Sequence, residues 1–289
     1  MPWRRPLPSC AINVILMQSL GRTTIHHTLL VITSALLLAG CAGLRDNAAD
    51  AKQGWTTIHP AVSYRSYNPI ADSVIHVARI NLRDARIRLA LSSSQQRGRT
   101  IDQFPEHNDA LIAVNASFFS KTFVPRGLTA SEGDAWDDAT PASDWPLLVC
   151  DRESHCEIHT LPPATSSPNW YTVASGIPAL LEAGQDVSAA LCAPRLKFCN
   201  DPHPRTAVGL DASRNTLWIV AAEGRHPPVL GISIAQLIDI LRQLGASDAL
   251  NLDGGGSSTF SIRGKQLMQR PDNEKELRLI GNALFVLPN

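Results

Sequence analysis

Residues 251–260, with the sequence NLDGGGSSTF, constrain the fold and function of this chain more than any other stretch. Residues 249–252 are mostly apolar and predict a buried strand that ends at Asp253. Three glycines and a serine follow: Gly254, Gly255, Gly256 and Ser257. A carboxylate at a strand end, beside a backbone that a ligand can approach closely, suits chemistry on a polar substrate. Successive glycine N–H groups can also form an anion-binding nest.

Two common glycine-rich motifs are excluded at this stretch. The phosphate loop of NTPases requires Gly-x4-Gly-Lys-Ser/Thr, and residues 251–260 hold no lysine. The nucleophile elbow requires Gly-x-Ser-x-Gly, but Thr259 stands where the last glycine would be. The alternative without chemistry is a tight glycine turn between two strands, capped by Asp253.

The first forty residues have the layout of a lipoprotein signal peptide. Arg22 precedes an apolar stretch at residues 29–39, and Gly40 stands before Cys41. The stretch is short for a membrane span. Leu-Ala-Gly-Cys resembles the bacterial lipobox, so we expect residues 1–40 to be removed and Cys41 to be lipidated. The alternative is an ordinary signal peptide with an incidental cysteine.

The segment after Cys41 predicts where the protein resides. Residues 41–53 are small and polar, which is typical of a tether between a lipid and a folded domain, here residues 54–289. Ala42 after the cysteine resembles the outer-membrane sorting pattern of Gram-negative lipoproteins. We therefore expect a protein of the bacterial cell envelope, with its lipid anchor in the outer membrane and its domain facing the periplasm.

The charge of the expected mature chain argues against a nucleic-acid partner. The whole chain has 26 basic and 26 acidic residues. Removal of residues 1–40 takes away Arg4, Arg5 and Arg22 but no acidic residue, which leaves a net charge of about −3. Nucleic-acid binding wants a basic surface.

Four further cysteines fall into two local pairs: Cys150 with Cys156, and Cys192 with Cys199. In an exported protein this spacing suggests two disulfides that close short loops. Zinc is the alternative, because His155 and His159 lie beside the first pair, but the spacing does not match the common zinc motifs. We expect no metal and no cofactor.

The pattern of apolar residues predicts an α+β fold in one domain, with strand-rich mixed sheets and few helices. Alternation at residues 73–91 predicts two strands joined by a turn near Asp84. Residues 234–244 have apolar residues at helical spacing, with Ser233 as a cap and Gly245 as a stop. Further strands are expected at 110–114, 147–150, 216–222, 249–253, 259–262 and 283–287.

Five short motifs occur in order between Asn115 and Thr259. They are Asn115-Ala-Ser-Phe-Phe, Ser175-Gly-Ile-Pro, Pro204-Arg-Thr-Ala-Val-Gly, Glu223-Gly-Arg and residues 251–259. Together these blocks resemble the phosphodiester glycosidase family. The chain departs from the usual pattern in three places, where Ala116 and Ser117 replace glycines and Glu223 replaces an aspartate.

The resemblance implies hydrolysis of a sugar-1-phosphodiester between the anomeric carbon and the phosphate oxygen, with a phosphate-linked carbohydrate as substrate. Asp253 and Glu223 would supply the catalytic carboxylates. Arg205 and Arg225, with the backbone of residues 254–257, would hold the phosphate, because guanidinium groups bind phosphate bidentately. Asn115 would be a polar contact at the mouth of the pocket. Apart from the resemblance, His203 is a candidate proton donor, and the alternative is a structural role, which is more common for a histidine between two prolines.

A non-catalytic lipoprotein that binds glycan or phosphate is the alternative function, since a fold does not fix an activity. Such a protein would keep Arg205 and the glycine loop but tolerate altered acids. Glu223 is the departure that favours this alternative.

Overall fold

Three β-sheets organise the part of the chain that the computed structural model describes, which is residues 54–139, 145–161, 167 and 169–289. These residues belong to one compact unit. The predicted signal peptide, Cys41 and the tether at 41–53 lie outside the described residues. Among the described residues, no helix combines the length and apolar character needed to cross a bilayer.

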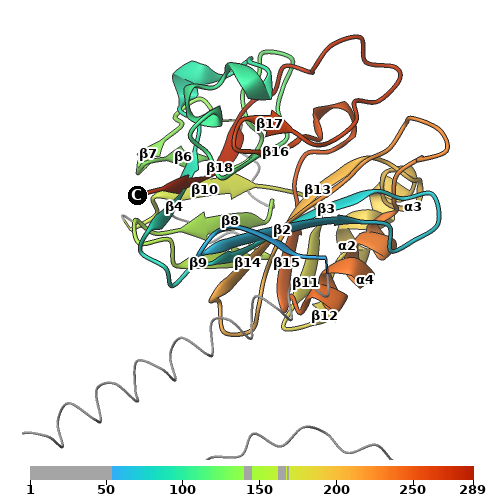
Figure 1. The fold of residues 1–289 in the computed structure, drawn as a ribbon, viewed down its shortest axis with the longest axis horizontal. Coiled ribbons are helices and arrows are strands. Elements are labelled where there is room, and N and C mark those ends of the chain that lie inside the picture. The colour runs from blue at the N-terminus through green and yellow to red at the C-terminus, as the bar shows by residue number, and fades with distance from the viewer. Residues whose placement is uncertain (1–53, 140–144, 162–166, 168) are drawn as a thin grey trace, which may run out of the picture. The chain divides into compact units, whose positions relative to one another are not determined.

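The first sheet has eight strands, and neighbouring strands pair antiparallel (Figure 1). Its order is β1 (Thr56–His59), β2 (Val62–Tyr67), β3 (Ile75–Asn81), β14 (Thr216–Ala222), β13 (Arg205–Leu210), β15 (Asp248–Asn251), β11 (Ala179–Glu182) and β12 (Gln185–Asp186). The central strands β14, β13 and β15 carry most of the predicted site residues at their ends.

Two five-stranded antiparallel sheets complete the strand framework. The second sheet has the order β17 (Lys265–Gln266), β16 (Phe260–Ile262), β5 (Ile112–Asn115), β18 (Ala283–Pro288) and β4 (Ile87–Leu91). The third has the order β7 (Asp134–Ala135), β6 (Ala130–Ser131), β10 (Thr172–Ser175), β8 (Leu147–Cys150) and β9 (Cys156–His159).

Helices are few among the described residues, so the predicted α+β class is confirmed. The α-helices are α2 (Ala189–Cys192), α3 (Leu196–Asn200) and α4 (Ile234–Leu244). Short 3-10 turns occur at Ser94–Gln96, Ile101–Gln103, Pro105–His107, Ala193–Arg195 and Gly255–Ser257.

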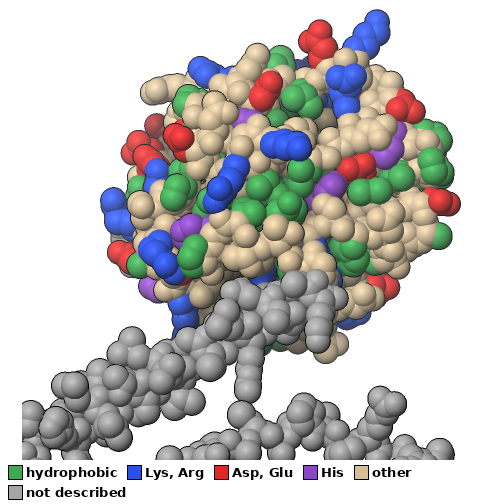
Figure 2. All heavy atoms as spheres, in the orientation of Figure 1, with side chains coloured by type: hydrophobic (Ala, Val, Ile, Leu, Met, Phe, Trp, Pro, Cys, Tyr) green, Lys and Arg blue, Asp and Glu red, His purple; other side chains and the backbone are tan. Residues whose placement is uncertain are grey.

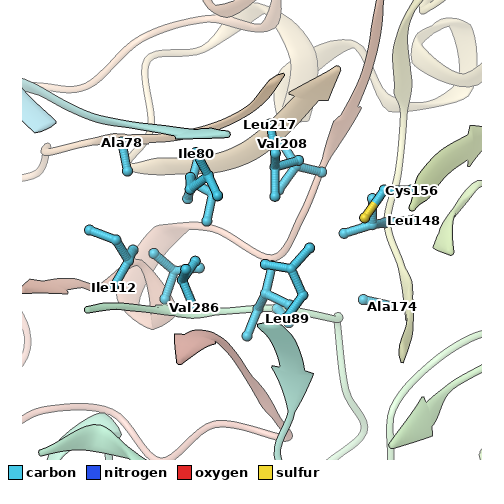
Figure 3. Close-up of a cluster of buried hydrophobic side chains, with 14 of the residues drawn as sticks. Ala78, Ile80, Leu89, Ile112, Leu148, Cys156, Ala174, Val208, Leu217 and Val286 are labelled. Carbon is cyan, nitrogen blue, oxygen red and sulfur yellow. The ribbon is translucent and has the colours of Figure 1, made fainter. Parts of the chain in front are cut away.

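The main hydrophobic core lies where the three sheets face one another. In Figure 3, Ile80 and Val208 of the first sheet point toward Ile112 and Val286 of the second, and Leu148 of the third closes one side. All five side chains are fully buried. This core positions one end of the second sheet against one end of the first.

Helix α4 covers the opposite face of the first sheet, where Leu237 and Leu241 pack against a second core that includes Val220. As predicted, Ser233 caps it: the Ser233 hydroxyl accepts from Gln236 N at 3.2 Å. Gly245 ends it with φ 92°, a left-handed conformation that glycine adopts readily. The helix thereby delivers the chain into β15.

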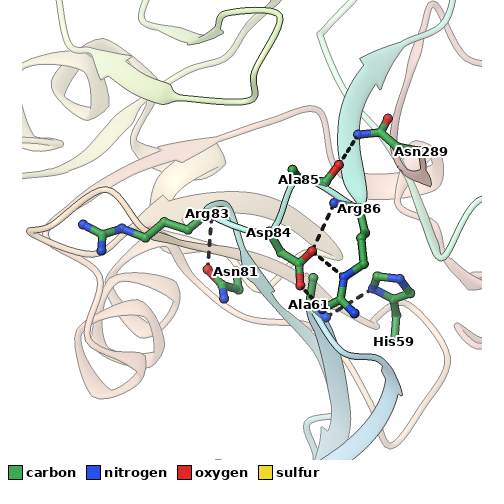
Figure 4. Close-up of polar contacts among 8 residues, drawn as sticks. All are labelled: His59, Ala61, Asn81, Arg83, Asp84, Ala85, Arg86 and Asn289. Carbon is green, nitrogen blue, oxygen red and sulfur yellow. Dashed lines mark hydrogen bonds and ion pairs between the residues drawn. The ribbon is translucent and has the colours of Figure 1, made fainter. Parts of the chain in front are cut away.

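The two strands predicted within residues 73–91 are present as β3 and β4, but they belong to different sheets. Between them, Asp84 Oδ1 accepts from Arg86 N at 3.0 Å and from Arg86 Nε at 2.8 Å (Figure 4). Asn289 Nδ2 donates to Ala85 O at 2.7 Å. The turn therefore passes the chain from the first sheet to the second and is bonded to the last residue.

Both predicted disulfides are present. The Cys150–Cys156 bond joins neighbouring positions of β8 and β9, and the Cys192–Cys199 bond joins α2 to α3. On the face shown in Figure 2, acidic and basic side chains are interspersed among uncharged ones.

Gly176 allows the Ser-Gly-x-Pro motif to pack directly on the end of β15. A Cβ atom at Gly176 would overlap the carbonyl oxygen of Asn251 and lie 2.9 Å from the Leu250 side chain. The first of these contacts is backbone, which cannot rotate away. This motif is therefore part of the scaffold under the predicted site.

We predict that Gly176→Ala lowers the free energy of unfolding by about 1–3 kcal/mol, because it overpacks a rigid site. Chemical denaturation of the full chain would measure this. Gly184→Ala is the control: it has open space but φ 79°, so it should cost roughly 1 kcal/mol from backbone strain alone. Equal losses for the two variants would contradict the packing argument.

Candidate functional site

The site is formed where β14 and β15 end on either side of β13. Both strands are antiparallel to β13, so they run in the same direction and reach the same edge of the sheet. Ala222 pairs with Arg205, and Leu252 N donates to Thr206 O at 2.9 Å. Two strand spacings then separate the chain at Glu223 from the chain at Asp253, or roughly 10 Å.

Asp253 is half-buried at the start of the glycine loop. Its Oδ1 accepts from Gly254 N at 2.9 Å, and its own N–H donates to Ala116 O at 2.9 Å. Burial raises the pKa of Asp253 to about 6, against the opposing effects of the Ser257 hydroxyl, the Gly254 N–H and the Arg278 charge. A carboxyl group in this range exchanges its proton near neutral pH, as catalytic carboxylates do.

The glycine loop permits close packing, and its N–H groups are largely committed to the protein. Gly255 N donates to Pro204 O at 2.8 Å, and Ser257 N donates to Gly254 O at 3.2 Å. A Cβ atom at Gly254 would lie 2.8 Å from Pro204 O. The N–H groups that were predicted to form an anion nest at residues 254–257 are therefore mostly bonded within the protein.

Arg225 is the half-buried cation that lies against the glycine loop. Its guanidinium nitrogens would be 3.2 Å from a Cβ atom at Gly255. One of them donates to His203 Nδ1 at 3.3 Å. Burial, with the charges of Arg205 and Arg225, lowers the pKa of His203, so this imidazole is the neutral acceptor. His203 thus orients Arg225, and this geometry does not favour the predicted role of His203 as a proton donor.

Glu223 is buried and both of its carboxylate oxygens face imidazole nitrogens. Oε1 lies 2.7 Å from His76 Nε2 in a hydrogen bond, and His76 Nδ1 bonds the Ser66 hydroxyl at 2.7 Å. Oε2 lies 2.9 Å from His226 Nε2, where the geometry is that of an ion-pair contact without a hydrogen bond. Glu223 is 5% exposed. The two histidines therefore occupy the carboxylate oxygens that a substrate would have to contact.

The surroundings of Glu223 keep it ionised. Burial would raise its pKa, but the hydrogen bond from His76, the backbone N–H of Gln269 and the two imidazole charges outweigh burial and hold the pKa below its ordinary value. Asp253 and Glu223 therefore differ: the first has a raised pKa and partial exposure, and the second is a buried, clamped anion.

Arg205 is placed on the helix-covered face of the sheet and is 1% exposed. Its Nε donates to Ile232 O at 3.1 Å, and one terminal nitrogen donates to Phe198 O at 2.5 Å and Asp201 O at 3.2 Å. Burial, with the Arg225 charge, lowers its pKa to about 10, so it remains protonated at neutral pH. These contacts give Arg205 an architectural role, in place of the phosphate contact expected from its motif.

Asn115 joins the two sheets beneath Asp253. Its Nδ2 donates to Asp253 O at 2.6 Å, and its Oδ1 accepts from Thr206 Oγ1 at 2.7 Å and from Thr259 N at 3.1 Å. At 1% exposed, the amide is not at a pocket mouth. It fixes the position of the Asp253 backbone.

The loop between β17 and β18 crosses the site and adds a second cation, Arg278. Asp272 N donates to Arg225 O at 2.9 Å. Arg278 forms an ion pair with Glu274, and both side chains lie close to Gly256. The positive charge of Arg278 acts to lower the pKa of Asp253. The loop thereby places the positive charge of Arg278 within electrostatic reach of the Asp253 carboxyl group.

Sequence reasoning missed His76, His226 and Arg278. His76 could have been noticed, because it lies on the inward face of an apolar strand, where a polar side chain requires a partner. His226 follows the Glu-Gly-Arg motif directly, but its orientation depends on the hairpin after it. Arg278 stands in an aperiodic loop with no signal.

A carboxylate of raised pKa, with the Arg278 charge acting on it and the Arg225 guanidinium against the adjoining loop, suits chemistry on an anionic substrate. The family model described as phosphodiester glycosidase matches residues 108–287, more than half of the chain. The protein therefore belongs to the phosphodiester glycosidase family, and the resemblance drawn from its motifs is confirmed.

The chain is also similar to individual known proteins, in sequence or in fold. A 68-residue segment is 40% identical to the mouse (Mus musculus) N-acetylglucosamine-1-phosphodiester alpha-N-acetylglucosaminidase, covering 24% of this chain but only 13% of the mouse protein. The zebrafish catalytic domain of the same name, auto-inhibited by its pro-peptide, has a similar fold, with a TM-score of 0.68 and 17% identity over 81% of this chain and 86% of that one. A hypothetical protein from Synechocystis has a TM-score of 0.55 at 17% identity, over 81% of this chain and 63% of that one.

We predict that Glu223→Gln destabilises the protein by about 3 kcal/mol, because it leaves the buried imidazoles of His76 and His226 without their carboxylate partner. The pKa of Glu223 is lower in the folded state, so its stabilising contribution is present above its unfolded pKa and is lost as the pH falls through the folded value. Thermal unfolding at several pH values should show a difference between wild type and variant that persists down to about pH 5 and shrinks only in stronger acid. A difference that is absent at pH 7 would contradict this role for Glu223.

Proposed function

We propose that this protein hydrolyses the glycosidic bond of a sugar-1-phosphodiester, between the anomeric carbon and the phosphate oxygen. The observation that carries the proposal is the half-buried Asp253 carboxyl group, with a pKa of about 6, at the start of the glycine loop whose Gly255 lies against the Arg225 guanidinium. Family membership supports hydrolysis of this substrate class.

Asp253 is the proposed reacting carboxylate. It either removes a proton from water, whose oxygen then bonds the anomeric carbon, or bonds that carbon itself before water displaces it. In both courses the bond from carbon to phosphate oxygen breaks, and a phosphate monoester leaves with the electron pair. Both courses also require Asp253 to be ionised.

The cations stabilise the departing phosphate. Arg225, held by neutral His203, can bind two phosphate oxygens, and Arg278 adds positive charge near Asp253. Because a phosphodiester is already a fair leaving group, this charge reduces the need for a separate acid. Glu223 has an indirect role: it fixes the backbone at the end of β14, two residues before Arg225.

We further propose that the enzyme is a lipid-anchored envelope protein acting on a phosphate-linked cell-envelope or extracellular glycan. The lipobox-like sequence before Cys41 supports the anchor, and the two disulfides agree with an oxidising compartment. Labelling cells with a radioactive fatty acid would show incorporation that Cys41→Ala abolishes. No label in the wild type would remove the anchor from the proposal.

The pH dependence of hydrolysis tests the role of Asp253. Because its ionised form reacts, kcat/KM should rise with pH through about 6 and then reach a plateau. Asp253→Asn should lose at least about 100-fold in kcat/KM and the rise near pH 6. A wild-type rate that falls through pH 6 would instead show that protonated Asp253 is required.

Arg225 and Arg205 should respond differently to substitution. Arg225→Met is expected to lower kcat/KM by about 100-fold with little change in stability, because it removes a phosphate contact. Arg205→Met is expected to lower the free energy of unfolding by about 2–4 kcal/mol, because it leaves buried carbonyl groups without donors. Steady-state kinetics and denaturation of both variants make the comparison. A stable, inactive Arg205→Met would return that arginine to the phosphate site.

The non-catalytic alternative has its own outcome in the same assays. A glycan-binding lipoprotein would bind sugar-1-phosphodiesters saturably and release no free sugar from any of them. Calorimetry beside the hydrolysis assay therefore distinguishes the two functions.

A further inference from the structure

An ion pair between Glu274 and Arg278 lies directly on the glycine loop. A Cβ atom at Gly256 would overlap both the Glu274 carboxylate and the Arg278 guanidinium, so the pair rests on bare backbone. At the neighbouring Gly255, the corresponding position lies next to the Arg225 guanidinium. Two consecutive glycines therefore carry two cations, and one of these cations already has an anionic partner from the protein itself.

This ion pair is exposed enough to break at little cost. The Arg278 side chain is 40% exposed and the Glu274 side chain is 18% exposed. Ion pairs in contact with water contribute little to stability, because solvent and salt screen them. A phosphate group offers a guanidinium the same bidentate pairing that a carboxylate does. A phosphate near the loop therefore competes with Glu274 on nearly equal terms.

The backbone on both sides of the pair is fixed, so only the Glu274 side chain has to move. Asp272 N donates to Arg225 O at 2.9 Å, and Ile280 N donates to Arg99 O at 2.9 Å. Ile280 is also buried, which secures the second end of the segment. Rotation of a side chain that reaches solvent takes on the order of nanoseconds, so the exchange needs no rearrangement of the fold.

A buried hydroxyl group next to the pair has no partner. Ser258 is 8% exposed, and its Oγ makes no hydrogen bond to any of the described residues. Together with Gly256 and Arg278 it lines a hollow of about 10 Å³, about the space of one water molecule. Because buried polar groups normally have partners, this hydroxyl marks a place for an oxygen atom of a ligand. Movement of the Glu274 carboxylate away from Gly256 would widen the hollow.

We infer that Glu274 competes with the phosphate group of the substrate for Arg278. The inference rests on the proposed function, which places that phosphate at Arg225 beside the same loop. In the free protein the Glu274 carboxylate pairs with Arg278. In the complex a phosphate oxygen takes its place, and the Ser258 hydroxyl gains a partner. When the phosphate monoester leaves, Glu274 returns to Arg278, so this carboxylate lowers the affinity of the site for anions and favours release of the product.

The test measures the affinity of the full chain for inorganic phosphate by calorimetry. Glu274→Gln should bind phosphate about threefold to tenfold more tightly than the wild type, because an amide competes weakly for a guanidinium and does not repel an anion. Glu276→Gln removes the same charge from an exposed side chain of the same loop and is the matched control. It should change the affinity by less than about twofold, because solvent and salt screen that charge. In an Arg278→Ala background, Glu274→Gln should have no further effect, since the two residues act as one pair.

The sign of the effect decides the inference. Weaker phosphate binding by Glu274→Gln would mean that the carboxylate positions Arg278 for the phosphate, and would overturn it. An equal gain in Glu276→Gln, a gain that persists without Arg278, or no phosphate binding by any of these chains would also overturn it.

Failure of the proposed function would look different. In that case the wild type would release no sugar from any sugar-1-phosphodiester. The affinities of wild type and Glu274→Gln for inorganic phosphate, which need no turnover, would still decide whether Glu274 competes for Arg278.

Discussion

The antiparallel pairing of β13 with both β14 and β15 is the constraint on which the site depends. It makes two strands that are distant in sequence end at the same edge, so Glu223 and Asp253 emerge two strand spacings apart. Asn115 then secures this edge to the second sheet, since one amide bonds the Asp253 backbone, Thr206 and Thr259.

The replacement of aspartate by glutamate at position 223 has a structural explanation. The side chain is buried and reaches two imidazole rings at once, one on β3 and one in the hairpin after β14. These contacts lower the pKa of Glu223, so its carboxyl group stays ionised. The glutamate side chain, one methylene longer than aspartate, holds this carboxylate between the two imidazole rings. A clamped anion of this kind fixes the backbone before Arg225. The departure that favoured a non-catalytic protein is therefore compatible with a working site.

The sequence predicted the elements of the fold well because local patterns determine them. Helix α4 has a cap, an apolar face and a glycine stop, and Cys150 and Cys192 each have a partner a few residues away. The direction of a side chain at a strand end is less accessible. Arg205 follows the strand alternation to the helix-covered face, and a motif alone cannot show this. His76 meets Glu223 across 147 residues, a contact that only the sheet order creates.

The central claim is that Asp253 is the reacting carboxylate and that the bond between the anomeric carbon and the phosphate oxygen breaks. Hydrolysis of a sugar-1-phosphodiester in water labelled with heavy oxygen, followed by mass spectrometry of both products, tests it most directly. The account predicts label in the released sugar, none in the phosphate monoester, and no release by Asp253→Asn. Label in the phosphate product would mean that water attacks phosphorus, and the protein would then be a phosphodiesterase of a different mechanism.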